Sequence, residues 1–326
     1  MTAQESNSEA GIVTARGLGG RRVRVLAHGG MSGKFLVQDE CHLYWTDSVD
    51  QTLTRLPKDG GVPLILVTGQ GGIGAMTRAG GWLYWVNASQ VVRMPEQGGD
   101  VEVLADGLLW PKSIAVRGDV VVWTDYGHGG DEGTVQRLTL GDRRVVRLAE
   151  GQKMPTSVSI DQQHVYWVNH GVKRPDYFKD GSVVRVPLEG DRAPTVLATD
   201  QRLASSLVMD DAAIYWVTAL DYDSNASRGA LWKWSKAGGA VVELASWRWN
   251  EATHLALDET HVYWLAPIRL ALFRVRKDGG EEEQMMTEDN VGRAALSSSF
   301  VVDERCVYWT VHDSGRAGGA VFKMAK

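Results

Sequence analysis

The chain of 326 residues is 44% hydrophobic and 23% charged, the proportions of an ordinary globular protein. Its net charge of −5 argues against a nucleic-acid partner, because nucleic-acid binding normally needs a basic face. No apolar run approaches the roughly 20 residues that cross a bilayer, so no membrane partner is expected. The two cysteines, Cys41 and Cys306, are too few for a disulfide framework, and we expect buried, inert thiols.

The polar N-terminus has no signal-peptide core, which predicts a cytoplasmic protein. A protein exported with its signal peptide removed would have the same sequence, so export is the alternative. We expect residues 1–21 to form a flexible N-terminal tail and residues 22–326 to form a single domain.

A repeated motif accounts for seven of the 13 tryptophans, and in six of the seven copies a tyrosine precedes the tryptophan. The copies are Leu43-Tyr44-Trp45, Leu83-Tyr84-Trp85, Val121-Val122-Trp123, Val165-Tyr166-Trp167, Ile214-Tyr215-Trp216, Val262-Tyr263-Trp264 and Val307-Tyr308-Trp309. Successive tryptophans are 38 to 49 residues apart, so seven units fill almost the whole chain. Short strands at this period are typical of propeller blades.

Each unit has four strand-like pieces separated by turn signals, which in the fourth unit are residues 157–160, 164–168, 182–186 and 195–198. The sequence therefore predicts an all-β fold, a seven-bladed β-propeller with four antiparallel strands per blade. Successive strand residues point to opposite faces of a sheet. Adjacent tyrosine and tryptophan should each fill the gap to one neighbouring blade, as core residues and not as a ligand cage.

The two ends of the repeat predict how the ring closes. The chain stops after a third-strand piece, residues 320–324, and begins, after the tail, with a fourth-strand piece, residues 22–27. We expect the N-terminal strand to complete the last blade as its outer strand, in a 3+1 arrangement. This removes the open seam between the first and last blades.

Leu43-Tyr44-Trp45-Thr46-Asp47 contains a complete YWTD tetrapeptide, and Val122-Trp123-Thr124-Asp125 has three of its four letters. On these residues the chain resembles the YWTD-type and NHL-like β-propellers over residues 22–326. The receptor members have six blades and cysteine-rich flanking modules, whereas seven units and no such modules are found here. The family includes receptors, scaffolds, lactonases and lyases, so the resemblance implies the fold and leaves function open.

Function is expected on the face of the ring where the loops between second and third strands meet the loops between blades. We call it the loop face. Its longest loops, residues 125–133, 169–181 and 218–229, belong to adjacent blades three to five. The candidate ligand-binding residues are Trp110, Asp125, Tyr126, Tyr177, Phe178, Tyr222, Trp247 and Trp249. We expect a small molecule or a protein to bind them, at the loop face and channel mouth. For any single aromatic, the alternative is a plug at the base of a loop.

The alternative function is a propeller enzyme of the lyase, cyclase or lactonase type. The catalytic candidates are the loop-face histidines His128, His170, His254 and His312. One of them would act as general base, oriented by a carboxylate or helped by a divalent metal. Residues on separate loops have no fixed spacing, so the sequence does not decide between a binding module and an enzyme.

Asp221, Asp223 and Asn225 alternate like the oxygen ligands of a calcium-binding loop. Ala226 stands where that loop has glycine, and Trp232 where it has glutamate. Two readings therefore stay open, a shortened site for Ca²⁺ or Mg²⁺ and a solvated polar loop with no cofactor.

Asp47, Asn87, Asp125 and Asn169 each follow the motif tryptophan by two residues, in blades one to four. Such a partial ring of oxygen atoms could hold a cation. We expect instead that these side chains accept hydrogen bonds from the backbone of their own loops.

Overall fold

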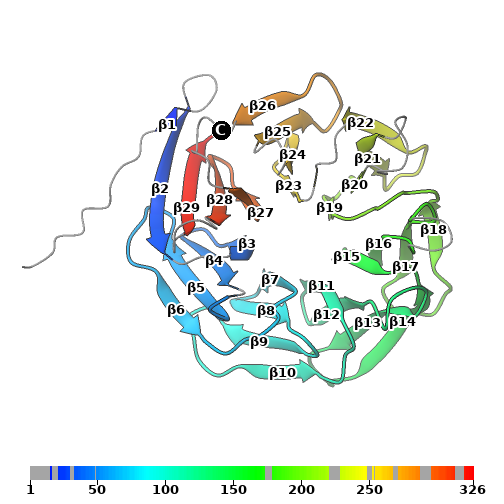
Figure 1. Ribbon diagram of the computed structural model, residues 1–326. Helices are drawn as coiled ribbons and strands as arrows, with labels where there is room; N and C mark the ends of the chain where they lie inside the picture. Colours follow the sequence, from blue (N-terminus) through cyan, green and yellow to red (C-terminus); the bar gives the residue numbers. More distant parts are fainter. Residues whose placement is uncertain are drawn as a thin grey trace, which may run out of the picture.

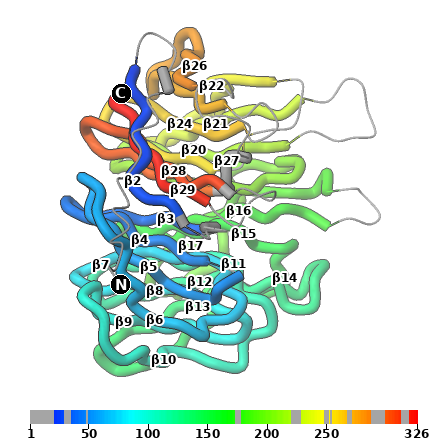
Figure 2. The backbone as a smooth tube through the Cα atoms, turned by 60° about the vertical axis from the view of Figure 1, so that its left-hand side comes forward, coloured from blue at the N-terminus to red at the C-terminus, as the bar shows by residue number. Residues whose placement is uncertain are grey.

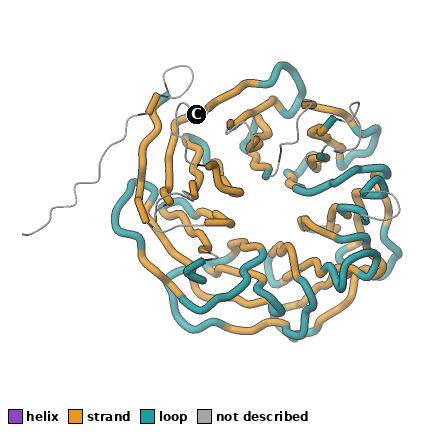
Figure 3. The backbone as a smooth tube through the Cα atoms, viewed as in Figure 1, coloured by secondary structure: helices purple, strands orange, loops and turns teal. Residues whose placement is uncertain are grey.

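The computed structural model describes residues 15–16, 21–29, 33–47, 49–172, 178–219, 228–247, 252, 254–266, 271–286, 295–312 and 319–326. Every regular element in these ranges is a strand (Figure 3). The described part of the chain therefore has no helix that is long and apolar enough to span a membrane.

The strands form seven antiparallel sheets arranged as blades around a ring (Figure 1), which confirms the predicted seven-bladed propeller. From the inner to the outer strand, blade one has β3 (Gly33–Gln38), β4 (His42–Asp47), β5 (Thr52–Pro57) and β6 (Leu64–Val67). Blade two has β7 (Ala75–Ala79), β8 (Trp82–Val86), β9 (Val91–Pro95) and β10 (Glu102–Ala105). Blade three has β11 (Pro111–Arg117), β12 (Val120–Asp125), β13 (Gly133–Thr139) and β14 (Val145–Gln152).

The next three blades repeat this order. Blade four has β15 (Pro155–Ile160), β16 (His164–Asn169), β17 (Ser182–Pro187) and β18 (Thr195–Ala198). Blade five has β19 (Leu207–Met209), β20 (Ala213–Thr218), β21 (Gly229–Ser235) and β22 (Val242–Trp247). Blade six has β23 (Leu255–Leu257), β24 (His261–Ala266), β25 (Ala271–Arg276) and β26 (Glu283–Met286).

The last blade joins the two ends of the chain. It has β27 (Ala295–Val302), β28 (Cys306–His312) and β29 (Gly319–Ala325), and β2 (Arg22–Gly29) as its fourth strand. β2 lies antiparallel beside β29 (Figures 1 and 2), which confirms the predicted 3+1 closure. Within the segment expected as a tail, β1 (Ala15–Arg16) pairs with β2 as a fifth strand.

Aromatic packing between blades follows the repeated motif. All its tyrosines and tryptophans are at most 2% exposed. The seven core clusters lie between neighbouring blades, and each contains the tryptophan of one blade with the tyrosine, or in one case Val122, of the blade before it. The cluster that contains Trp45 and Tyr308 closes the ring between blades seven and one. The expected filling of each gap is therefore confirmed.

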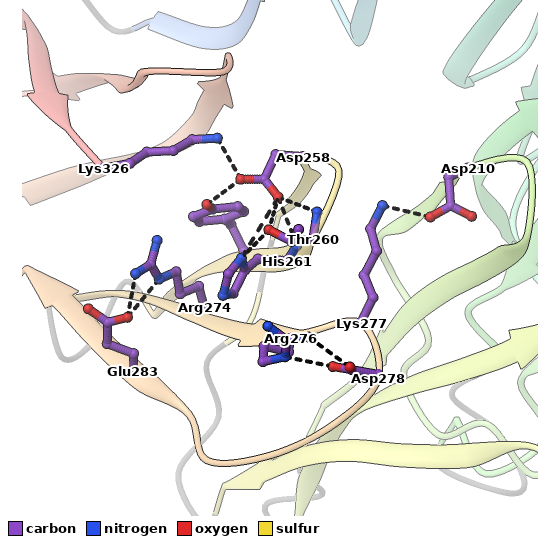
Figure 4. Close-up of polar contacts among 11 residues, drawn as sticks. Asp210, Asp258, Thr260, His261, Arg274, Arg276, Lys277, Asp278, Glu283 and Lys326 are labelled. Carbon is purple, nitrogen blue, oxygen red and sulfur yellow. Dashed lines mark hydrogen bonds and ion pairs between the residues drawn. The ribbon is translucent and has the colours of Figure 1, made fainter.

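A second repeated contact, which we call the clamp, joins four consecutive blade interfaces. The aspartate six residues before the motif tryptophan pairs with the lysine that follows the third strand of the next blade. The nitrogen–oxygen pairs are Lys236–Asp161 at 2.9 Å, Lys277–Asp210 at 2.7 Å, Lys326–Asp258 at 2.6 Å and Lys58–Asp303 at 2.8 Å, the second and third of which are drawn in Figure 4. Each ammonium also lies 5.2 to 6.0 Å from the centre of the motif tyrosine ring of the blade before.

The clamp fixes the charge of its carboxylate. Burial acts to raise the pKa of Asp161, but hydrogen bonds from Lys236 and from the backbone N–H groups of Gln163 and His164 outweigh burial and lower it to about 2. Burial and the nearby Asp161 charge raise the pKa of Tyr166 to about 12. The Asp161 carboxylate is therefore charged over the whole neutral range.

The cysteines depart from expectation in one respect. Cys41 is exposed and Cys306 is half-buried, and both are free thiols. The prediction of burial was wrong for Cys41, because that residue lies in the tight turn before β4 and its side chain does not enter a blade interface.

Removing β2 should open the ring. Deletion of residues 1–28 removes the outer strand of blade seven, so we expect a clear loss of unfolding free energy. Deletion of residues 1–14 leaves every described residue in place and should change little. Thermal melts of both variants beside the full chain check this, and equal melting temperatures for all three would contradict the closure described.

Asp161→Asn should weaken the protein in a pH-dependent way. The folded pKa of Asp161, about 2, lies below its usual value of 3.8, so the clamp stabilises the fold above pH 4 and this gain is lost as pH falls towards 2. At pH 7 we expect a loss of about 1 to 2 kcal/mol. Urea unfolding of both proteins between pH 7 and 3 should show the difference shrinking with acid. A difference independent of pH would show that the ion pair contributes nothing.

Candidate functional site

Part of the predicted site falls outside the described residues. Those positions are Tyr177, Tyr222, Trp249, Asp221, Asp223 and Asn225, and the side chain of His312. The roles of these residues stay predictions, and so does the cation site that Asp221, Asp223 and Asn225 would form. Within the described residues, no group of three or more histidine, cysteine, aspartate or glutamate side chains is placed to hold a metal ion.

An exposed aromatic turn marks the entry to blade three. Leu109 and Trp110 are 57% and 55% exposed. The buried Asp125 carboxylate fixes this turn by accepting hydrogen bonds from the N–H groups of Leu109, Trp110 and Gly127, each at 2.9 Å. Asp125 therefore acts as a loop cap and positions Trp110.

Trp110 and Tyr126 share one cation. Their ring centres are 6.1 Å apart, and the Lys112 ammonium lies 4.7 Å from the first ring and 4.8 Å from the second. Burial raises the pKa of Tyr126 to about 12, so its hydroxyl stays protonated. The turn thus presents a rigid aromatic edge to solvent.

The carboxylate and amide positions after the motif tryptophan divide into two kinds. Asp47 and Asn87, like Asp125, accept hydrogen bonds from backbone N–H groups of their own loops, as expected for loop caps. Asn169 differs, because its amide group donates to Gln152 and Ser182 instead. These four side chains therefore do not act as one cation ring.

Two other candidates lie apart from any polar cluster. Trp247 is half-buried and stacks on Trp264 of the next blade, with ring centres 5.9 Å apart. His128 is exposed, and no hydrogen bond to its ring is found within the described part of the chain. Trp247 therefore supports the packing of blades five and six in this structure.

His170 is held in one tautomer at the start of the blade-four loop. Its Nδ1 lies 3.0 Å from the carbonyl oxygen of Ala204, and because a carbonyl only accepts, Nδ1 carries the proton. Burial lowers the pKa of His170, which is therefore neutral at pH 7. Phe178 packs edge-on against the ring at 5.1 Å. The lone pair on Nε2 is left to accept a proton or a hydrogen bond.

Backbone strain is concentrated around this histidine. Of the six non-glycine residues with positive φ in the described part of the chain, four belong to the loops that surround it: Met154, Phe178, Asp200 and Leu203. Met154 accepts a hydrogen bond from the His170 N–H, and Phe178 accepts one from Leu203. A left-handed conformation costs a bulky residue on the order of 1–2 kcal/mol and is often found at functional sites.

A ladder of serines links the inner strands near the loop face. The serine ten residues before the motif tryptophan accepts a hydrogen bond from a backbone N–H of the next blade. The pairs are Ser113–Val158, Ser157–Leu207, Ser206–Leu255 and Ser299–Leu36, at 3.0 to 3.2 Å. Each serine satisfies a backbone donor on an inner-strand edge that no further strand covers.

His254 occupies this serine position in blade six. Its Nδ1 is buried, and it has no hydrogen-bond partner among the described residues. Burial lowers the pKa of His254 to about 4, so the ring is neutral at pH 7. A buried polar atom without a partner costs about 1–3 kcal/mol, which is the kind of local exception that proteins keep at functional sites.

The structure brings His170 and His254 to the two sides of one segment. His170 bonds to Ala204, and two residues later Ser206 bonds to Leu255, the neighbour of His254. We call the group of His170, residues 204–206 and His254 the channel-mouth site. It offers two neutral imidazoles and one strained loop, which suits hydrogen bonding to a ligand or proton transfer.

The sequence contained a signal for part of this site. Counting ten residues back from each of the seven motif tryptophans finds four serines, Phe35, Ala75 and His254, so His254 is the one histidine of the chain at this position. No comparable count finds His170, because its partner Ala204 comes from the entry to the next blade.

No protein-family model matches the chain, and no curated protein matches its sequence. Solved structures match in fold. An oligogalacturonate lyase in complex with manganese has a TM-score of 0.68 at 12% identity, covering 97% of this chain and 96% of that chain. The oligogalacturonate lyase of Vibrio parahaemolyticus has a TM-score of 0.66 at 9% identity, covering 98% of each chain. A chain of a nidogen/laminin complex has a TM-score of 0.56 at 16% identity, covering 76% of this chain and 94% of that one. At these identities the likeness shows the propeller fold alone.

His254→Ser should stabilise the protein, and more so in mild acid. Serine restores the acceptor that four other blades have. In addition, the folded pKa of His254, about 4, lies below the usual 6.5, so wild-type stability falls as pH drops from 6.5 towards 4. This loss is absent in the variant, whose advantage should grow by about 1–2 kcal/mol between pH 7 and 5. Urea unfolding at both pH values measures it. An advantage that does not grow in acid would contradict a buried neutral His254.

Proposed function

We propose that the protein binds a small molecule at the channel mouth and loop face, over blades three to five and the first residues of blade six. The observation that carries the proposal is the Nδ1 of His254, which has no partner among the described residues and lies beside the backbone segment that fixes His170. A ligand hydroxyl would satisfy this nitrogen in either tautomer, because a hydroxyl both donates and accepts. The exposed edge of Trp110 gives the same face a rigid apolar contact.

Binding, and not folding, best explains a histidine at this position. A serine there would offer the acceptor that four other blades have, so the histidine lowers stability without a structural gain. The same trade between stability and function accounts for the strained residues around His170. Membership of the YWTD-type or NHL-like propellers is part of the proposal, supported by the tetrapeptide ending at Asp47. A cytoplasmic location stays a prediction.

The test compares small molecules that copurify with the wild type and with His254→Ser. Both proteins are purified in parallel and denatured, and the released compounds are analysed by mass spectrometry. We expect at least one compound to be released by the wild type and to fall about tenfold or more in the variant. Because the variant should be the more stable protein, unfolding cannot explain such a loss. Identical sets of compounds from both proteins would refute the proposal.

The alternative function is an enzyme with His170 as general base. It is favoured by the fixed tautomer, which leaves Nε2 free to take a proton, and by burial, which keeps the ring neutral. No hydrogen bond joins a loop-face histidine to a carboxylate side chain in the described residues, so binding remains the first proposal. Turnover of a copurified compound by the wild type, but not by His170→Gln, would establish the enzyme.

A further inference from the structure

A cleft of about 750 Å³ opens between blades three and four, away from the channel-mouth site. Its walls are β14 of blade three and β17 and β18 of blade four. Neither His170 nor His254 lines it. The clamp positions at this interface hold Arg117 and Leu188 in place of aspartate and lysine, so no clamp draws the two blades together here.

Two hydrogen bonds from its amide nitrogen fix the Asn169 side chain at one end of this cleft. The amide nitrogen donates to Gln152 Oε1 and to Ser182 Oγ, both at 3.0 Å. Gln152 Oε1 also accepts the indole N–H of Trp167 at 3.0 Å, so the orientation of Gln152 is set as well. The direction of the Asn169 amide follows, since only its nitrogen can donate to these two oxygens.

The oxygen of this amide has no partner. Asn169 is 5% exposed, and its Oδ1 is buried without a hydrogen bond among the described residues. The equivalent side chains of blades one to three use their oxygens to cap loops. An unpaired buried carbonyl costs about 1–3 kcal/mol, and a ligand hydroxyl that reached it would recover that energy. The hydroxyl hydrogen of Ser182 makes no hydrogen bond within the described residues either, so a donor lies beside the acceptor.

The charges that line the cleft cancel in pairs. Lys153 pairs with Asp180 at 2.7 Å, and Arg147 pairs with Glu150 at 3.2 Å. A charged ligand would have to break one of these pairs or remain uncompensated. The lining therefore favours an uncharged ligand.

The remaining lining is apolar. Leu148 and Ala149 come from β14, and Val184 and Val196 come from β17 and β18. The cleft thus combines apolar side chains, of which Val196 is 53% exposed, with fixed hydroxyl and amide groups at one end. Its volume lies within the range of about 300–1,000 Å³ that small-molecule sites occupy.

We propose that this cleft binds an uncharged, hydroxyl-rich small molecule of the sugar class. A ligand hydroxyl donates to Asn169 Oδ1 and accepts from Ser182, while the C–H face of the sugar ring packs on Val184 and Val196. Because Asn169 Oδ1 is buried, binding requires the Ser182 side chain to rotate and admit the hydroxyl. This site is independent of the channel-mouth site, since neither His170 nor His254 lines the cleft.

The test is a titration of the full ¹⁵N-labelled chain, followed through the side-chain amide signal of Asn169. The uncharged probes are D-glucose, D-galactose, D-mannose and N-acetyl-D-glucosamine, and the charged ones are D-glucuronate and D-glucosamine. Val196→Arg fills the cleft. Val242→Arg is the matched control, because it also adds a charge to an outer strand, at a valine that is 51% exposed where Val196 is 53% exposed. Urea unfolding of both variants confirms that they fold.

We expect at least one uncharged sugar to shift the Asn169 signal saturably. Its dissociation constant should rise about tenfold or more in Val196→Arg and in Ser182→Ala, and stay unchanged in Val242→Arg. The proposal is overturned if no uncharged probe gives a saturable shift. It is equally overturned if a charged probe binds more tightly than its neutral parent, or if Val242→Arg weakens binding as much as Val196→Arg does.

Discussion

The contact on which this structure depends is the packing of one blade's tryptophan against the preceding blade's tyrosine. Neighbouring residues of a strand face opposite sides, so one dipeptide supplies core to two interfaces at once. Seven copies link each sheet to both of its neighbours. Each blade needs both of its neighbours to bury its two faces. Blade seven therefore has to be complete, and the N-terminal strand β2 supplies its fourth strand.

With the aromatic packing uniform, the differences between blades carry the functional information. Four of the seven blades have a hydrogen-bonded serine at the inner-strand position, whereas blades one, two and six have Phe35, Ala75 and His254 there. Of the four carboxylate or amide side chains two residues after the motif tryptophan, Asp47, Asn87 and Asp125 cap loops and Asn169 does not. His254 and Asn169 each have a buried polar atom without a hydrogen-bond partner among the described residues. Because the blades repeat, equivalent positions can be compared within one chain, and residues that differ from their equivalents stand out.

The fold was predictable from the sequence because the aromatic dipeptide recurs at a regular spacing, and each copy lies in its own strand. The site was predictable only in part. Asp125 follows the motif at a fixed distance, yet its role as the cap beneath Trp110 depends on a hydrogen bond to the loop from the previous blade. His170 depends likewise on Ala204. Such contacts join loops whose lengths vary, so no spacing encodes them. Trp247 illustrates another difficulty, since an aromatic side chain on a loop face can also contribute to the packing between blades.

The clamps also divide the ring into an arc of blades that they join and an arc that has none. They join blades four, five, six, seven and one into a continuous arc, whereas Glu96, Leu140 and Leu188 take the lysine position at the other three interfaces. β2 and β29 therefore pair inside the reinforced arc, in blade seven, whose Asp303 pairs with Lys58 of blade one and whose Lys326 pairs with Asp258 of blade six. Both interfaces of blade seven, where β2 closes the ring, consequently carry a clamp, and the three interfaces without one lie elsewhere. A circularly permuted chain, in which the present termini are joined and new termini are placed beside blade two, would keep all four clamps.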